Sequence, residues 1–108
     1  MSFNIIPTPT FEKELKQLSK KYPSLKQDFA KLAEQLIHEP RLGKPIGKNC
    51  FKIRLAITSK GKGKTGGARI ITYVLFSETS IYLISIYDKS EAVNIAESEI
   101  IKRIKYLD

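Results

Sequence analysis

Cysteine and long apolar runs are scarce in this sequence, and each scarcity excludes a class of protein. Cys50 is the single cysteine among 108 residues, so neither an internal disulfide nor a cluster of thiolate metal ligands can form. The apolar runs stay far below the ~18 consecutive residues that a membrane-spanning helix requires. The N-terminal stretch MSFNIIPTPTFEK does not have the layout of a signal peptide. We therefore expect a reduced, cytoplasmic protein.

Acidic residues are absent from the middle of the chain, between Pro40 and Ser77. That segment holds nine cations: Arg41, Lys44, Lys48, Lys52, Arg54, Lys60, Lys62, Lys64 and Arg69. The whole chain has 19 Lys and Arg against 11 Asp and Glu, so the remainder, with 10 cations against 11 acids, is nearly neutral. One contiguous basic segment is typical of a phosphate-binding surface, which makes nucleic acid the expected partner.

Two other readings of the basic segment stay open. A solvated basic face can serve solubility alone, although such faces usually mix both signs of charge. A membrane surface fits less well, because membrane binding favours an amphipathic basic helix and this segment is rich in glycine and flanked by predicted strands.

The length and composition favour a single domain over residues 1–108. Hydrophobic residues make up 42% and charged residues 28% of the chain, which excludes disorder and a collagen-like structure. A chain of this length has room for one modest hydrophobic core and for no second domain.

The N-terminal part of the chain predicts a short strand and a helical hairpin. Residues 2–7 are an apolar run ended by proline. Thr8 is a predicted N-cap, and Pro9 suits the first position of a helix. Ser24 and Gln27 form a predicted capping box for a second helix. The turn-rich segment that follows predicts a loop of roughly ten residues.

The C-terminal part predicts strands and a last helix. Residues 51–57 alternate between apolar and polar side chains, as in a strand with one buried face. Residues 68–76 and 80–87 are apolar at both odd and even positions, which face opposite sides of a strand. This pattern favours central strands joined by a hairpin. A helix is predicted from Asp88 or Ser90 onward, and its apolar face is expected to comprise Val93, Ala96, Ile100 and Ile104.

These elements predict an α+β fold with the order β-α-α-β-β-β-α. The sheet is expected to be small and mostly antiparallel, with the helical hairpin packed on one face. The other face of the sheet is expected to be free.

Period-two geometry predicts a basic sheet face. Lys52 and Arg54 should point away from the buried side chains of their strand. The hairpin to the next strand can bring Arg69 and Tyr73 beside Arg54. The connecting segment Ser59–Gly67 adds further lysines, and its glycines let the backbone approach a phosphate closely.

The glycine-rich connection is not a Walker A motif. It lies between two predicted strands, and no Gly-Lys-Ser/Thr in it opens a helix. Two interpretations of this segment stay open, a phosphate-binding loop and a flexible basic hairpin without a ligand.

Three stretches resemble the RelE/ParE superfamily of type II toxins, with the HigB-like branch the most similar: Phe51–Leu55 (FKIRL), Ser59–Tyr73 (SKGKGKTGGARIITY) and Ile86–Glu91 (IYDKSE). The order of predicted elements is similar over nearly the whole chain. This resemblance implies a small basic toxin that cuts messenger RNA in the ribosomal A site and is silenced by a cognate antitoxin. ParE relatives inhibit DNA gyrase instead.

The resemblance also implies site residues. Lys52 and Arg54 match basic positions on the second strand, Arg69 matches the arginine that opens the third, and Lys89 matches the cation after the fourth. The C-terminal catalytic tyrosine of RelE has no counterpart near Ile95, so another group has to transfer the proton.

RNA cleavage of this type needs no protein nucleophile, because the 2′-hydroxyl of RNA can attack the adjacent phosphate and expel the 5′-oxygen. Arg54 and Arg69 could hold the nonbridging oxygens and neutralise the added charge. The proton carrier is either Glu91 or one of the lysines, since clustered cations lower one another's pKa. Glu91 could equally be a helix-capping carboxylate.

The predicted catalytic residues are Arg54, Arg69, Lys89 and Glu91, and the predicted RNA-binding residues are Lys52, Lys60, Lys62, Lys64 and Tyr73. Tyr73 could stack on a base or only pack in the sheet. The basic segment holds no carboxylate cluster, so we expect no metal and no other cofactor.

The favoured function is a ribosome-dependent mRNA endoribonuclease with a cognate antitoxin. A non-catalytic gyrase inhibitor of the ParE kind and a basic module that only binds RNA or DNA are the alternatives.

Overall fold

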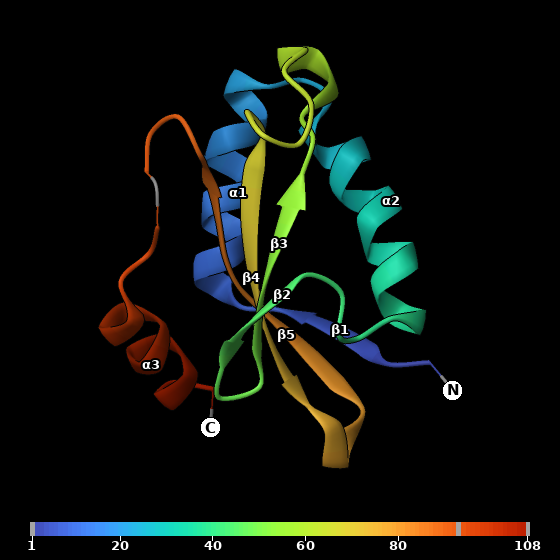
Figure 1. Cartoon of the computed structure of the whole chain (residues 1–108), viewed down its shortest axis with the longest axis vertical. Coiled ribbons are helices and arrows are strands. Elements are labelled where there is room, and N and C mark those ends of the chain that lie inside the picture. The colour runs from blue at the N-terminus through green and yellow to red at the C-terminus, as the bar shows by residue number, and fades with distance from the viewer. Residues whose placement is uncertain (1, 93, 108) are drawn as a thin grey trace.

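The structure, a computed structural model, describes residues 2–92 and 94–107. Within them, three α-helices accompany one five-stranded sheet (Figure 1). In chain order the elements are β1 (Asn4–Pro7), α1 (Pro9–Lys21), α2 (Leu25–His38), β2 (Lys44–Gly47), β3 (Cys50–Leu55), β4 (Ala68–Leu75), β5 (Ser80–Asp88) and α3 (Glu97–Lys105), with short 3₁₀ turns η1 (Thr58–Lys60) and η2 (Phe76–Glu78).

The sheet has the strand order β1-β5-β4-β3-β2. β1 runs parallel to β5, and all other neighbours are antiparallel, which confirms the predicted α+β fold with a mostly antiparallel sheet. The register of β3 and β4 sets Arg54 directly opposite Arg69. Side chains of these two residues therefore emerge side by side on one face, as the alternation predicts.

Strand β2 replaces part of the predicted loop, so that prediction was wrong. Lys44 pairs with Lys52 and Pro45 with Phe51. Lys48 and Asn49 both have positive φ, of 55° and 62°, and they form a two-residue hairpin turn between β2 and β3. Turns of this kind match the twist of the flanking strands, so the turn-rich sequence here closes a hairpin.

Helix α1 begins as predicted. The Thr8 hydroxyl accepts a hydrogen bond from the backbone N–H of Phe11 at 3.2 Å and donates one to the carbonyl of Leu83 at 2.8 Å, and Pro9 occupies the first turn. Ser24 precedes α2 but makes no cap hydrogen bond, so the predicted capping box is wrong. The Ser24 hydroxyl instead donates to Asp28 and contacts Ser59 in the β3–β4 connection.

The main core lies between the sheet and the α1–α2 hairpin. Its fully buried side chains come from both layers and include Phe11, Leu25, Leu36, Ile70, Val74, Ile81, Leu83 and Ile86. Most residues of β4 and β5 are buried on both faces of the sheet, which explains why these strands are apolar at both odd and even positions.

The opposite face of the sheet is only partly free, which corrects the expectation of an open face. Ile100 of α3 packs against Cys50, Ile71 and Ile84. Arg103 fixes this helix through hydrogen bonds to Glu14 of α1 at 3.0 Å and to the carbonyl of Ile84 at 2.9 Å.

Helix α3 begins at Glu97, later than the predicted start at Asp88 or Ser90. Asp88 is still part of β5, and the residues after it form a turn. Val93, which was predicted on the apolar face of this helix, lies outside the described residues. No helix in the two described ranges is long and apolar enough to cross a membrane.

Candidate nucleic-acid interface

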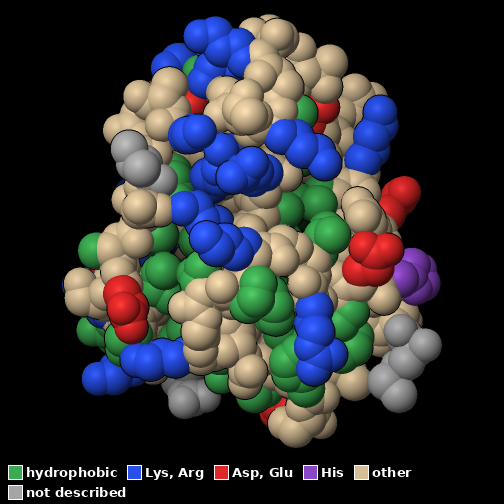
Figure 2. Space-filling view, in the orientation of Figure 1, with side chains coloured by type: hydrophobic (Ala, Val, Ile, Leu, Met, Phe, Trp, Pro, Cys, Tyr) green, Lys and Arg blue, Asp and Glu red, His purple; other side chains and the backbone are tan. Residues whose placement is uncertain are grey.

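A groove of about 930 Å³ crosses the face formed by β3, the β3–β4 connection and the exposed side of α2. Five of the predicted site residues line it: Lys52, Arg54, Lys64, Arg69 and Lys89. Lys31 and Lys44 add two more cations, and Asp28 is the one acidic side chain in the described lining. Figure 2 shows Lys and Arg side chains gathered in a band over this hollowed part of the surface. The groove therefore has the charge expected of a phosphate-binding site.

Arg54 and Arg69 have different environments although they are cross-strand neighbours. Arg54 is exposed, which leaves its guanidinium accessible from the groove. Arg69 is only 3% exposed, and its guanidinium donates to the carbonyls of Lys64 at 2.9 Å, Ala68 at 3.1 Å and Thr65 at 3.4 Å. Arg69 thus shapes the β3–β4 connection as well as lining the groove.

The charge on Arg69 persists despite its burial. Burial, with the adjacent Arg54, lowers the pKa of Arg69 from its ordinary value. An arginine nevertheless stays protonated at physiological pH. Arg69 therefore adds a positive charge to the lining of the groove.

Lys52 lies between the two arginines and Lys44 on the basic face. Its ammonium donates to the side-chain oxygen of Asn94. Burial lowers the pKa of Lys52 from its ordinary value of 10.5, and the neighbouring cations Arg69, Lys44, Arg54 and Lys89 lower it further. The lowered pKa increases the fraction of Lys52 that is a neutral amine at a given pH.

The three lysines of the β3–β4 connection have different positions and partners. Lys62 and Lys64 are exposed, but only Lys64 lines the groove. The side chain of Lys60 is 11% exposed, and its ammonium lies 2.7 Å from a carboxylate oxygen of Asp88. That hydrogen bond raises the pKa of Lys60. The connection thus offers Lys64 to the groove and holds Lys60 in an ion pair.

The turn after β5 separates two of the predicted catalytic residues. Lys89 lines the groove, and its backbone N–H donates to the carbonyl of Gly67 at 3.1 Å. Glu91 is not part of the groove lining and pairs with Lys21 at the end of α1, at 2.9 Å. The carboxylate of Glu91 is therefore directed away from the cations that face the groove.

Tyr73 also lies apart from the groove lining. It pairs across the sheet with Cys50, and its ring packs against Tyr82 with a centroid distance of 6.1 Å. Both tyrosines contact the cluster beneath α3. Of the two interpretations of Tyr73, packing in the sheet describes its observed contacts.

Gly67 fixes the end of the β3–β4 connection against β3. A Cβ atom at this position would lie 2.1 Å from the carbonyl oxygen of Leu55, which is closer than any real contact. Only glycine lets the connection return to the sheet here, directly before Ala68 and Arg69.

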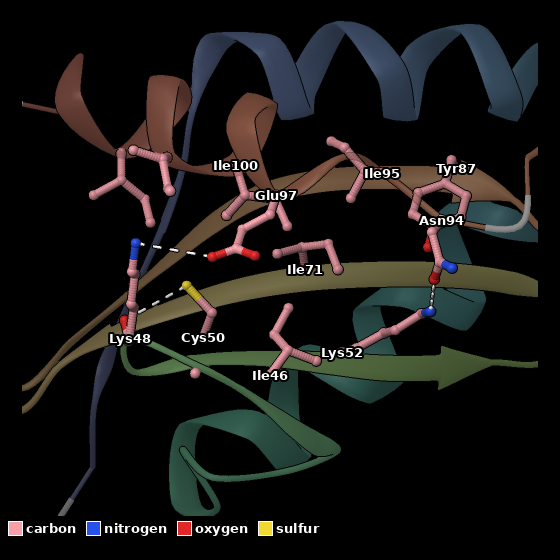
Figure 3. Close-up of a pocket in the computed structure, with 13 residues that line it drawn as sticks. Ile46, Lys48, Cys50, Lys52, Ile71, Tyr87, Asn94, Ile95, Glu97 and Ile100 are labelled. Atoms are coloured by element: carbon pink, nitrogen blue, oxygen red, sulfur yellow. Dashed lines mark hydrogen bonds and ion pairs between the residues drawn. The ribbon is translucent and has the colours of Figure 1, made fainter.

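A second, smaller cavity of about 170 Å³ lies between α3 and the β2–β3 hairpin. Figure 3 shows Ile46, Ile71, Ile95 and Ile100 around it, with Lys52 and Asn94 joined at one end. The thiol of Cys50 also lines this cavity, and burial raises its pKa to about 11. The thiol is therefore protonated and unreactive at neutral pH.

Comparison with solved structures identifies the architecture. The chain superposes on a double arginine-to-alanine mutant of the Escherichia coli toxin RelE in the free state with a TM-score of 0.67, at 24% identity, over 96% of this chain and 99% of that one. The fold is that of RelE. None of the known protein-family models matches the chain.

Two toxin–antitoxin complexes have the same fold in their toxin. One is the E. coli RelBE complex, with a TM-score of 0.62 at 19% identity over 81% of this chain and 96% of that one. The other is a RelBE-type complex from Mycobacterium tuberculosis, with a TM-score of 0.57 at 18% identity over 82% and 99%. At such identities the likeness concerns the fold.

On this RelE fold the groove includes residues that sequence analysis did not single out. Lys31 and Gln35 line it from α2, and Asn94 lines it from the segment before α3. Helical spacing could have indicated that Lys31 and Gln35 share a face. Asn94 had no such signal, because its position depends on the turn that delays α3.

Proposed function

We propose that the chain is the toxin of a toxin–antitoxin pair and an mRNA endoribonuclease that acts on the ribosome in the cytoplasm. It would belong to the RelE/ParE superfamily, in the HigB-like branch that the stretch Ser59–Tyr73 resembles. The observation that carries this proposal is the convergence of Lys52, Arg54, Arg69 and Lys89 on one groove. The RelE fold and the antitoxin complexes of its structural neighbours support it.

The proposed reaction uses the nucleophile of the RNA itself. The 2′-oxygen attacks the adjacent phosphorus as its proton leaves, the bond to the 5′-oxygen breaks, and that oxygen takes up a proton. Arg54 and Arg69 hold the nonbridging oxygens and stabilise the charge that develops on the phosphate. Lys89 and Lys64 bind neighbouring phosphates. No metal takes part in this scheme.

Lys52 is the proposed proton carrier. It lies on the same strand face as Arg54, and its lowered pKa increases the fraction of neutral amine that can accept the 2′-hydroxyl proton. Glu91 is less suited to this role, because it is paired with Lys21 outside the groove lining.

The proposed partner that silences the toxin is a cognate antitoxin. Such a protein would need acidic or apolar segments that complement this basic surface. Lys60, Lys62 and Tyr73 stay predicted RNA ligands that do not line the groove, and any contact they make with RNA would extend beyond it.

Expression in bacteria followed by primer extension on cellular messages tests this function. We expect growth arrest and new internal 5′ ends in translated messages. A gyrase inhibitor of the ParE kind would change plasmid supercoiling without cutting messages, and a basic binding module would do neither.

The metal-free scheme is tested by a purified ribosome assay. Cleavage should persist in the presence of EDTA when enough magnesium is added to keep the ribosomes intact. Loss of cleavage that only a transition metal reverses would contradict the metal-free scheme.

A further inference from the structure

Asp88 is a buried carboxylate that the proposed reaction does not use. It is the last residue of β5 and 1% exposed. One carboxylate oxygen accepts a hydrogen bond from the Tyr22 hydroxyl at 2.5 Å. The other accepts from the Lys60 ammonium at 2.7 Å, and from the backbone N–H and hydroxyl of Ser90 at 2.9 and 2.8 Å.

These four donors keep the carboxylate ionised. Burial by itself would raise the pKa of Asp88, but the hydrogen bonds from Lys60, Tyr22 and Ser90 outweigh it and hold the pKa well below its ordinary value. The charges of Asp88 and Lys60 therefore form a nearly buried ion pair. Pairs of this kind add little net stability compared with well-packed apolar residues, so stability alone does not account for this one.

The donors to Asp88 come from three separate segments. Tyr22 directly follows α1, Lys60 ends η1 at the start of the glycine-rich part of the connection, and Ser90 lies in the turn that carries Lys89. These segments meet at the top of Figure 1, where the β3–β4 connection lies over the ends of β4 and β5. Asp88 is the point at which they are joined.

Other contacts fix the same connection at its two ends. Asp28 accepts hydrogen bonds from the backbone N–H and hydroxyl of Thr58 at 2.9 and 2.6 Å. Arg69 binds the carbonyls of Lys64 and Thr65. Between these anchors Gly61 and Gly63 adopt positive φ, which turns the chain tightly. The connection is thus an ordered loop whose backbone conformation is fixed by a small number of polar contacts.

We propose that Asp88 is a positioning residue for the candidate nuclease site. Through Lys60 it holds the β3–β4 connection, and through Ser90 it holds the turn after β5, so that Lys64 and Lys89 face the same groove. This inference rests on the proposed function and gives Lys60 the role of an anchor in place of the predicted RNA contact. If Lys60 moved to a phosphate, it would leave the carboxylate of Asp88 buried without its cation, which is costly.

Three variants test this role: Asp88→Asn, Lys60→Met and the double variant. Asp88→Asn keeps the shape of the side chain and removes its charge, and the double variant leaves no buried unpaired charge. We expect each single variant to lower kcat/KM for message cleavage on ribosomes on the order of tenfold to a hundredfold, because displaced catalytic groups lose activity steeply. The kcat/KM of the double variant should be no lower than that of the poorer single variant, because both substitutions break the same contact between Lys60 and Asp88.

Lys31→Met provides the matched control for coupling. Lys31 lines the groove from α2 and is not one of the donors to Asp88, so its effect should multiply with that of Asp88→Asn. Lys60 would behave like Lys31 if it bound RNA independently of Asp88. In that case the loss of kcat/KM in the Lys60→Met, Asp88→Asn double variant would equal the product of the two single losses, and this result would overturn the proposal.

Two readouts separate positioning from general stability. Hydrogen exchange in Asp88→Asn should accelerate in residues 58–67 and 88–92 while α2 and the central strands stay protected at the assay temperature. The pH dependence of kcat should keep its wild-type shape, since no proton carrier is removed. A uniform acceleration across the molecule, or unchanged exchange in the loop, would contradict the assigned role.

The exchange measurement also keeps the two proposals distinguishable. A wild-type protein that cuts no message would remove the proposed nuclease function. Exchange in the Asp88 and Lys60 variants would still report whether this carboxylate holds the connection.

Discussion

Replacing Arg54 by alanine is expected to lower the rate of message cleavage by about a hundredfold to a thousandfold, the usual cost of removing one preorganised donor from a developing negative charge. The side chain is exposed on the groove face and lies opposite Arg69, so it can move onto a phosphate without breaking a hydrogen bond or ion pair to residues 2–92 or 94–107. The loss should appear in kcat and in kcat/KM together, because the interaction forms mainly in the transition state. Single-turnover cleavage on programmed ribosomes measures both.

Arg54 makes a sharper test than Arg69 because of their environments. Arg69→Ala would also release the carbonyls of Lys64, Ala68 and Thr65, so a loss of activity would have two explanations. Lys16→Ala serves as the control for general charge, since Lys16 is exposed on α1 and outside the groove lining. Equal losses in the Arg54 and Lys16 variants would count against a localised phosphate site.

Replacing Lys52 by arginine is expected to lower kcat by roughly a hundredfold to ten-thousandfold, the range for loss of a general acid or base. Arginine keeps the positive charge but cannot release its proton at accessible pH. KM should therefore change much less than kcat. Steady-state kinetics over a pH series would measure both constants.

The pH dependence of the cleavage rate is a second test of Lys52 as the proton carrier. As a general base Lys52 acts in its neutral form, so the wild-type rate should rise with pH until the lysine is deprotonated. Since burial and its cationic neighbours lower the pKa of Lys52, that rise should end below the ordinary pKa of 10.5, and the Lys52→Arg variant should lack it. Lys44→Arg, a change on the exposed rim, is the matched control. A Lys52→Arg enzyme with unchanged kcat would assign the proton transfer to another group.

Sequence patterns predicted Lys52, Arg54 and Arg69 on one face of the sheet, because strand alternation is a local property. The prediction that Tyr73 lies beside Arg54 was wrong, because the register pairs Tyr73 with Cys50. Lys52, Arg54 and Arg69 face the groove because strict period-two geometry and a register fixed by the buried face leave no other arrangement. The helical hairpin followed from capping and apolar spacing for the same reason, although its second cap was misassigned.

The parts that sequence analysis missed depend on contacts between distant segments. Asp88 looked like the start of a helix, yet its carboxylate is occupied by Tyr22, Lys60 and Ser90. Lys60 looked like Lys62 and Lys64 in a basic run, and only the fold shows that Lys60 is paired with Asp88 while the other two are exposed. Glu91 likewise faces Lys21, a partner seventy residues away along the chain.

The most direct test of the central claim is cleavage of a message that carries a single 2′-deoxynucleotide immediately before the scissile phosphate. The groove is proposed to hold a phosphodiester while the adjacent 2′-oxygen attacks it, so this message should remain intact on ribosomes with the wild-type protein. The matched all-ribose message should be cut and should leave a 2′,3′-cyclic phosphate. Cleavage of the deoxy-substituted message at the same bond would show that water or a protein group is the nucleophile, and would contradict the mechanism.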